Sequence, residues 1–225
     1  MSLITSYPEN LRKAFPGSNI ISEKPIIITV DDFISKEECE EILRLNFLDI
    51  ERAGVSDITG GYISDARTAH HKWFTFQDSV FKKIGDRVSS YLGVSLRNSE
   101  RPSIIRYLPG EEYKPHFDAW DVTTQKGKNH TKQGGQRIWS CILYLNDVEE
   151  GGTTSFTDIA ETIHPKQGRL LFFSNIHFNN PLRPDNLTRH SGDPVIKGEK
   201  WICTLWFRMA GLQDEVNYEY DEALT

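Results

Sequence analysis

A His-x-Asp sequence, His116-Phe117-Asp118, ends a stretch that begins at Tyr107. In an extended strand, side chains two positions apart point to the same face. The imidazole of His116 and the carboxylate of Asp118 would then offer a nitrogen and an oxygen to one point in space. Alone, such a pair is also compatible with an ordinary surface contact, so a metal site requires a third ligand.

The best candidate for that third ligand is His190, in the segment Thr188-Arg189-His190-Ser191-Gly192-Asp193-Pro194. His177 is a rival, because it also follows an apolar, strand-like run. Two histidines and one carboxylate on one side of a metal ion, with the other side open, are typical of non-haem Fe(II) oxygenases.

Lys200 follows His190 by ten residues and begins a long strand-like segment, which we expect over Glu199–Arg208. The period of two in a strand puts Lys200, Thr204 and Trp206 on one face. A lysine that points inward needs an anionic partner. A dicarboxylate co-substrate would supply one, with one end on the metal ion and the other paired with the ammonium group. Trp206 could close the pocket against the carbon chain of that ligand.

The order of the elements predicts an α+β chain that is mainly β. Residues 1–24 are polar and suggest a loosely packed arm, residues 25–210 a single domain, and residues 211–225 a tail. Within the domain, a helix is expected at about 35–48, where Ser35 and Glu38 form a capping box. A second helix is expected at about 78–92, with Gly93 as its stop.

From residue 102 onward, strands dominate and turn signals separate them. The strands are expected at 103–108, 112–117, 137–146, 153–156, 168–173 and 199–208. Two polar segments, 51–72 and 121–136, are expected to be loops, the second of them flexible and beside the site. Helices followed by many strands indicate a jelly-roll core at about 102–209, with the N-terminal helices packed on one sheet.

Composition limits the classes of function. The 225 residues are 38% hydrophobic and 26% charged, as in soluble globular proteins. The net charge of -6 argues against nucleic acid as a partner. A local basic patch could still form from Lys126, Lys128, Lys132 and Arg137.

The three cysteines, Cys39, Cys141 and Cys203, show no paired spacing, and two of them lie in apolar strand-like runs. Buried free thiols in a reducing compartment are the expected result. The N-terminal residues do not read as a secretory signal, and no apolar run approaches the ~20 residues of a membrane span. We therefore expect a cytoplasmic protein with no membrane association.

Five sequence blocks, in order, carry a resemblance to a known family. They are Ile104 to Asp118, Gly134-Gly135-Gln136-Arg137, Leu143 to Thr154, Pro165 to Phe173, and His190 to Trp201. With these blocks, residues 30–209 resemble the prolyl 4-hydroxylase family of Fe(II)- and 2-oxoglutarate-dependent dioxygenases. The fold implied by this resemblance is the double-stranded β-helix, a jelly roll.

The resemblance implies hydroxylation of a prolyl residue in a peptide or protein at the 4-position, with O2 consumed and succinate and CO2 released. Fe(II) and 2-oxoglutarate would be required, and ascorbate would serve as reductant. By matching position, the implied iron ligands are His116, Asp118 and His190. The implied 2-oxoglutarate residues are Lys200, Tyr107, Thr154 and Trp206. The implied substrate residues are Tyr113, Arg137, Arg67 and Trp73.

Three departures from the family concern the substrate side. Arg208 stands where the family often has His, the segment 175–189 is rich in Asn and Pro, and the segment 121–132 is rich in Lys. The same chemistry on a free amino acid, another side chain or a small metabolite is therefore an open alternative. A non-catalytic metal-binding jelly roll is another, although Lys200 and Tyr107 argue against it. A metallohydrolase is the weakest alternative, because no general base is evident beside His116.

Overall fold

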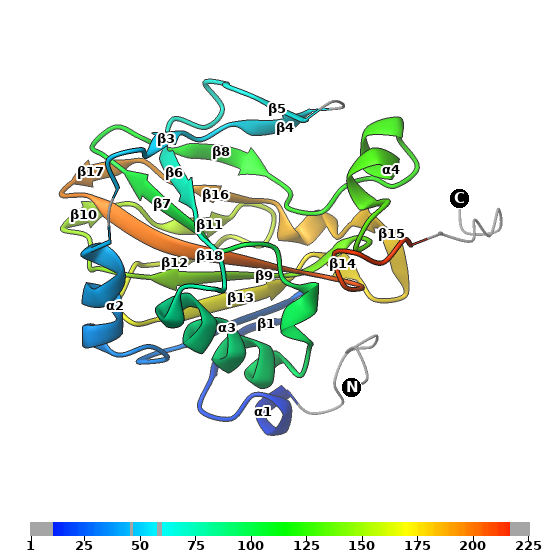
Figure 1. The fold of residues 1–225 in the computed structure, drawn as a ribbon, viewed down its shortest axis with the longest axis horizontal. Helices are drawn as coiled ribbons and strands as arrows, with labels where there is room; N and C mark the ends of the chain where they lie inside the picture. Colours follow the sequence, from blue (N-terminus) through cyan, green and yellow to red (C-terminus); the bar gives the residue numbers. More distant parts are fainter. Residues whose placement is uncertain (1–10, 46, 58–59, 217–225) are drawn as a thin grey trace.

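The computed structural model describes residues 11–45, 47–57 and 60–216, and shows two β-sheets facing each other, with the N-terminal helices on the outside of the larger sheet (Figure 1). The helices are α1 (Leu11–Ala14), α2 (Lys36–Leu43), α3 (Ser79–Leu92) and α4 (Gln125–Thr131), with 3-10 turns at Leu96–Asn98 and Asn186–Thr188. The strands are β1 (Asn19–Glu23), β2 (Ile26–Val30), β3 (Glu51–Arg52), β4 (Val55–Asp57), β5 (Gly60–Tyr62), β6 (His70–Trp73), β7 (Ser103–Tyr107), β8 (Tyr113–His116), β9 (Arg137–Tyr144), β10 (Glu150–Gly151), β11 (Thr154–Phe156), β12 (Glu161–Ile163), β13 (Leu170–Ser174), β14 (Ile176–His177), β15 (Asn180–Pro184), β16 (His190–Gly192), β17 (Val195–Lys197) and β18 (Lys200–Arg208).

The larger sheet has the strand order β1-β2-β13-β9-β18-β7-β6-β3, and the smaller sheet has the order β12-β11-β16-β8. Neighbours in both sheets are antiparallel and mostly far apart in sequence. This crossing over between sheets is the jelly-roll arrangement, so the expected fold class is confirmed.

The sequence of β13 explains how one sheet serves two cores. Leu170 and Phe172 point to the helices, whereas Leu171 and Phe173 point to the smaller sheet, and all four are fully buried. A strand covered on both faces loses the alternation of polar and apolar residues. The core between the two sheets is the one that reaches the metal-ligand candidates.

The two expected helices form where their caps predict. The hydroxyl of Ser35 accepts from the backbone N–H of Glu38, and the Glu38 carboxylate accepts from the N–H of Ser35. The second helix ends at Gly93, whose φ of 67° lies in the left-handed region that favours glycine. The first helix ends at Leu43 instead of near residue 48.

The prediction of a loosely packed arm at residues 1–24 is wrong for residues 11–24. Phe15 is only 1% exposed and packs against Trp139 and Phe172, and β1 pairs with β2 at the edge of the larger sheet. Isolated apolar residues in a polar stretch gave too little periodicity to reveal this packing. Residues 1–10 lie outside the described residues.

The flexible loop expected at 121–136 is also corrected, because it contains helix α4. Thr124 caps the helix by accepting from the N–H of Gly127, and a side chain at Gly127 would overlap the carbonyl of Asp121. The loop expected at 51–72 carries four short strands, β3 to β6.

At the C-terminal end, part of the segment expected as a tail is ordered against the chain after α4. Gly134 donates to the carbonyl of Asp214, and Val216 donates to that of Lys132. Residues 217–225 lie outside the described part. In the described part of the chain, no helix is long and apolar enough to cross a membrane.

Candidate active site

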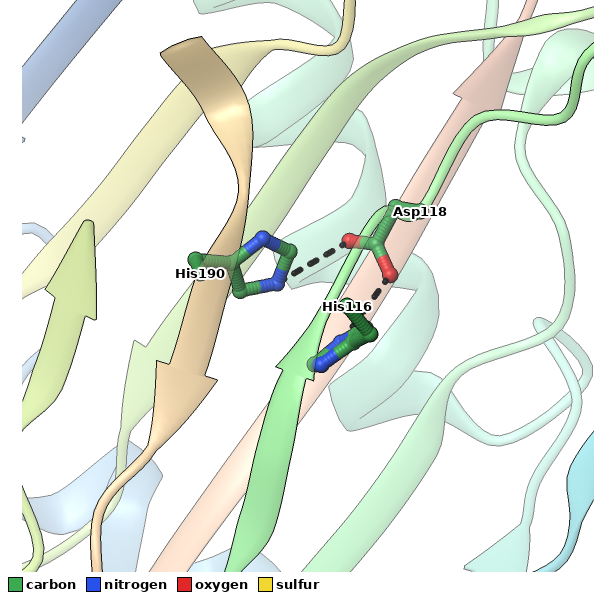
Figure 2. A group of neighbouring side chains, drawn as sticks. All are labelled: His116, Asp118 and His190. Atoms are coloured by element: carbon green, nitrogen blue, oxygen red, sulfur yellow. Dashed lines mark ion pairs between the residues drawn. The ribbon is translucent and has the colours of Figure 1, made fainter. Parts of the chain in front are cut away.

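His116, Asp118 and His190 converge between the two sheets (Figure 2). His116 ends β8 and His190 begins β16, and the two residues face each other in the register of this strand pair. Asp118 lies two residues beyond the end of β8. One carboxylate oxygen lies 3.7 Å from Nε2 of His116 and the other 3.7 Å from Nε2 of His190. All three candidate ligand atoms lie within 4.8 Å of one another.

Backbone carbonyls set the orientation of both imidazoles. Nδ1 of His116 lies 2.9 Å from the carbonyl of Lys114, and Nδ1 of His190 lies 2.9 Å from that of Thr188. Each Nδ1–H can donate to its carbonyl, which leaves the lone pair of Nε2 directed at the cluster. A hydrogen bond at the distal nitrogen that fixes ring and tautomer is common in protein metal sites.

The carboxylate of Asp118 is also held in place. Its Oδ2 accepts from the hydroxyl of Ser140 at 2.5 Å and from the indole N–H of Trp206 at 3.0 Å. Asn175 in turn bonds to Ser140. These donors leave Oδ1 as the oxygen that is available to a cation.

The electrostatics of the cluster suit a cation. Burial is the main cause that lowers the pKa of His116 to about 3, so its imidazole is neutral at neutral pH. Burial opposes ionisation of Asp118, but the neighbouring His190 and His116 hold the pKa of that carboxyl well below its ordinary value. Neutral imidazole and ionised carboxylate are the forms that bind metals.

His177, the rival third ligand, lies elsewhere. It is exposed on the short strand β14, whereas His190 is 4% exposed and belongs to the cluster. The difference arises from strand pairing, because β16 pairs with β8 and β14 pairs with β15.

An inner pocket extends from the cluster between the sheets and ends at Lys200. Lys200 is 1% exposed, and its Nζ lies 3.4 Å from the carbonyl oxygen of Thr153. Among the described residues, no carboxylate forms an ion pair with it. Burial lowers the pKa of Lys200 to about 7, although Asp193 opposes this effect. A buried ammonium group without a direct counter-ion calls for an anionic ligand.

The other residues expected at the co-substrate also line this inner pocket. Tyr107 pairs with Lys200 across β7 and β18, and its ring centroid lies 5.2 Å from the ammonium group. The hydroxyl of Thr154 accepts from Tyr144 at 2.8 Å, so its own O–H can donate into the pocket. Trp206 lies near the mouth of the pocket, where it also contacts Asp118.

An outer groove opens on the other side of the cluster and shares Asp118, Arg67, Tyr113 and Trp206 with the inner pocket. All four residues expected to face the substrate line it: Tyr113, Arg137, Arg67 and Trp73. The ring of Tyr113 stacks on His116 with centroids 3.5 Å apart, and the guanidinium of Arg67 lies 4.8 Å from its centroid.

Arg137 is not part of a basic surface patch. It forms a two-pronged ion pair with Glu100, with both N–O distances 2.7 Å. Its guanidinium lies between the rings of Trp206 and Trp120, at 4.2 Å and 4.5 Å from their centroids. Arg208 shares Glu100 at 2.8 Å. The expected basic patch therefore loses Arg137 and keeps Lys126 and Lys128 of α4 and Lys132 beside it.

Several residues of the site were not identified from the sequence. Ser140, Asn175, Glu100 and Trp120 position Asp118 or Arg137. Ser140 did carry a signal, because it is a hydroxyl residue inside the otherwise apolar strand β9. A buried polar side chain requires a partner.

The sequence of the chain matches known proteins. A family model described as the 2OG-Fe(II) oxygenase superfamily matches residues 102–208. Prolyl 4-hydroxylase 5 of Arabidopsis thaliana is 30% identical over 213 residues, covering 84% of this chain and 70% of the relative. The chain belongs to the prolyl 4-hydroxylase family. Prolyl 4-hydroxylase 2 of the same plant is 29% identical, with 84% and 69% covered.

A solved structure agrees with this family membership. The viral collagen prolyl hydroxylase of Paramecium Bursaria Chlorella virus-1, in its 2OG complex, superposes with a TM-score of 0.64 and 26% identity, over 81% of this chain and 94% of the viral one. The protein is therefore a 2-oxoglutarate-dependent dioxygenase that uses Fe(II) and O2. Ascorbate is the reductant typical of this family.

The residues of this site fit both Fe(II) and 2-oxoglutarate. Two imidazoles and a carboxylate suit Fe(II) and leave part of its coordination open. The buried cation Lys200 lines the pocket that also holds these ligands, as a dicarboxylate requires.

Proposed function

We propose that this member of the prolyl 4-hydroxylase family hydroxylates prolyl residues of a peptide or protein at the 4-position. In this reaction, O2 supplies one oxygen atom to the prolyl C–H bond and the other to 2-oxoglutarate. The 2-oxoglutarate loses CO2 and becomes succinate. Iron and 2-oxoglutarate, when bound, supply the activation of O2, and the protein supplies binding and geometry.

The observation that carries the proposal is the meeting of two different cavities at Asp118. The inner pocket is small, about 40 Å³, and is lined by a buried cation, which suits a small dicarboxylate. The outer groove is wider and is lined by Trp73, Trp120 and Trp206. Aromatic faces of this kind pack well against prolyl rings in peptides.

On the co-substrate side, we assign iron binding to His116, Asp118 and His190. The far carboxylate of 2-oxoglutarate pairs with Lys200 and accepts hydrogen bonds from Tyr107 and Thr154. Thr154 is suited to this role because Tyr144 occupies the acceptor side of its hydroxyl. Trp206 covers the carbon chain and holds Asp118.

On the substrate side, Arg137 contributes a fixed hydrogen-bond donor rather than a free charge. Glu100 neutralises the guanidinium and takes up Nε and Nη2, and Nη1 lies 3.5 Å from the carbonyl of Asp118. A neutral acceptor such as a peptide carbonyl suits the Nη1 side of this neutralised guanidinium better than a carboxylate does. Tyr113 and Arg67 form the adjoining wall, and Trp73, 38% exposed, offers a surface to the prolyl ring.

The test is mass spectrometry of a panel of proline-containing peptides after incubation with the enzyme, Fe(II), 2-oxoglutarate and ascorbate. Free proline and a proline-free peptide are included in parallel. We expect one added oxygen on a prolyl residue and an equal amount of succinate. Hydroxylation of free proline alone would move the assignment to a small-molecule hydroxylase, and succinate formation without any hydroxylated product would overturn it.

Ligand variants separate the metal site from the rest of the protein. His116→Ala, Asp118→Ala and His190→Ala are expected to abolish succinate formation. His177→Ala is the matched control, because this histidine is exposed on β14, and it should keep full activity. An active His190→Ala variant together with an inactive His177→Ala variant would show that the third ligand is assigned wrongly.

A further inference from the structure

A second groove continues from the outer groove toward α4, and we call it the α4 groove. Its walls come from the chain around Trp120, from α4 and from β15, including Asp121, Lys126 and Arg183. α4 and β15 lie at the same end of the molecule (Figure 1), and Val122 donates to the carbonyl of Leu182 at 2.8 Å. The groove has a volume of about 690 Å³, which is in the range of ligand-binding clefts.

The α4 groove adjoins the outer groove. Phe117 and Trp120 line both, and they flank the proposed iron ligand Asp118 in the chain. Phe117 is 37% exposed, so it offers an apolar surface between the two grooves. A peptide with its proline at the metal centre can therefore run from one groove into the other.

The wall between the grooves is rigid. The ring of Trp120 stacks on His130 of α4, with centroids 5.1 Å apart and planes 9° apart, and Arg137 and Arg208 lie against it. The backbone of Trp120 is bonded in both directions to the side-chain amide of Gln136. A binding surface with so many fixed contacts is already formed before a ligand arrives.

The charge of the α4 groove differs from that of the molecule. The whole chain carries a net charge of -6, but this groove is lined by two cations, Lys126 and Arg183, and one acid, Asp121. Oδ1 of Asp121 is bonded to Thr123, and its Oδ2 lies 3.7 Å from Nε of Arg183. The side chain of Arg183 is 58% exposed, and an ion pair this open adds little stability.

We propose that the α4 groove is a subsite for an acidic side chain of the peptide substrate, at a position removed from the hydroxylated proline. The proposal rests on the proposed function, because the occupant is the same peptide that enters the outer groove. Arg183 is the residue that selects the carboxylate, and Lys126 adds to the local positive potential. The subsite acts on binding, because Arg183 lies outside both the metal cluster and the inner pocket.

The test uses a neutral proline peptide that the enzyme hydroxylates, with one Asp placed in turn at each position before and after the proline. Matched peptides carry Asn or Lys at the same positions. Peptide binding is measured by fluorescence anisotropy under anaerobic conditions on Mn(II)-loaded enzyme with 2-oxoglutarate, and KM and kcat are measured separately. We expect Asp to lower Kd and KM about threefold relative to Asn at one or two adjacent positions, with kcat unchanged.

Charge reversal gives the sharper result. Arg183→Glu should abolish the preference for Asp and favour Lys at the same position. Lys36→Glu is the matched control, because Lys36 is exposed on α2 at the far end of the molecule, and it should change nothing.

Two outcomes separate the subsite from the proposed function. If the neutral peptide is hydroxylated but no position shows a preference that depends on Arg183, the subsite is refuted and the proposed function stands. If no peptide is hydroxylated or bound and a free amino acid is, both are refuted.

Discussion

At the scale of single residues, the proposed metal site depends on donors that hold Asp118 for a cation. Trp206 is the clearest of them, because its indole N–H bonds to Oδ2 at 3.0 Å and its ring packs on Arg137. Partners of metal ligands usually change metal affinity when they are replaced.

Trp206→Phe should therefore weaken Fe(II) or Mn(II) binding about tenfold or more. Calorimetry under anaerobic conditions measures this affinity directly. Trp73→Phe is the control, because Trp73 lines the same groove and its ring lies 6.0 Å from that of Trp206. Among the described hydrogen bonds, none joins Trp73 to Asp118. Equal metal affinity in the two variants would mean that the indole N–H does not hold the ligand.

The second prediction at this scale concerns Lys200, because burial lowers its pKa to about 7. A bound carboxylate favours the protonated form, so 2-oxoglutarate should bind best below about pH 7 and more weakly above it. Between pH 7 and pH 8 we expect affinity to fall about fivefold, with proton uptake on binding.

Calorimetry of Mn(II)-loaded enzyme, in buffers with different ionisation enthalpies, measures both quantities. Lys200→Arg keeps its charge at all these pH values and should remove the pH dependence, even if overall affinity falls. A wild-type affinity that is flat from pH 6 to about pH 9 would contradict a buried, titrating Lys200.

Sequence reasoning identified the ligand atoms better than it identified the residues around them. His116 and Asp118 are close in sequence, and Lys200 marked the histidine ten residues before it. Ser140, Asn175 and Glu100 come from three distant segments that only the strand pairing brings together. No local spacing indicates such contacts.

At the scale of elements, Arg208 links the last strand to the segment that carries α4. Its guanidinium bonds to the carbonyls of His130 and Gly135 at 2.7 Å and 2.9 Å and to the carboxylate of Glu100 at 2.8 Å. This residue was noted in the sequence as a departure from the family. Its position suggests that it fixes the wall between the outer groove and the α4 groove.

Arg208→Met should lower the free energy of unfolding by about 3 kcal/mol, because it removes a partner of a buried carboxylate. Amide hydrogen exchange should also accelerate in residues 125–135, where the two carbonyls lose their donor. Denaturant unfolding and exchange mass spectrometry measure these effects. For the control Arg183→Met, at an exposed position, the free energy of unfolding should stay within about 0.5 kcal/mol of the wild-type value. Unchanged exchange in α4 would show that Arg208 does not anchor it.

The elements that sequence patterns predicted well are those with local signals. The capping box at Ser35 and the glycine stop at Gly93 were both found where expected. α4 was missed because its polar, lysine-rich sequence has no apolar stripe, and its order comes from the cap at Thr124 and the contacts of Trp120 and Arg208. β1 was missed because it is stabilised by pairing with β2.

At the scale of the whole molecule, ion pairs to the buried carboxylate of Glu38 join helix α2 to helix α3. Glu38 of α2 receives both prongs of Arg87 of α3, at 2.7 Å and 2.8 Å, and Lys83 at 2.9 Å. The hydrogen bonds from Arg87, only partly offset by burial, lower the pKa of Glu38 from 4.5 to about 2.

A carboxyl with a lowered pKa in the folded state stabilises the fold above its unfolded pKa and loses this effect as pH falls toward the folded value. Above pH 4.5, the free energy of unfolding of the wild type should thus exceed that of Glu38→Gln by up to about 3 kcal/mol. This difference should disappear as the pH falls toward 2. Urea unfolding at several pH values measures it. Glu40→Gln, which forms only exposed pairs, should be nearly neutral throughout. A difference that does not depend on pH would contradict this origin.

In the whole molecule, a small co-substrate pocket and a larger peptide groove meet at one proposed iron site. Incubation with a proline peptide and 2-oxoglutarate under 18O2, followed by mass spectrometry of both products, tests it most directly. We expect one labelled oxygen on the prolyl residue and one in succinate, in equal amounts. An unlabelled hydroxyl group, or labelled succinate with no hydroxylated peptide, would contradict it.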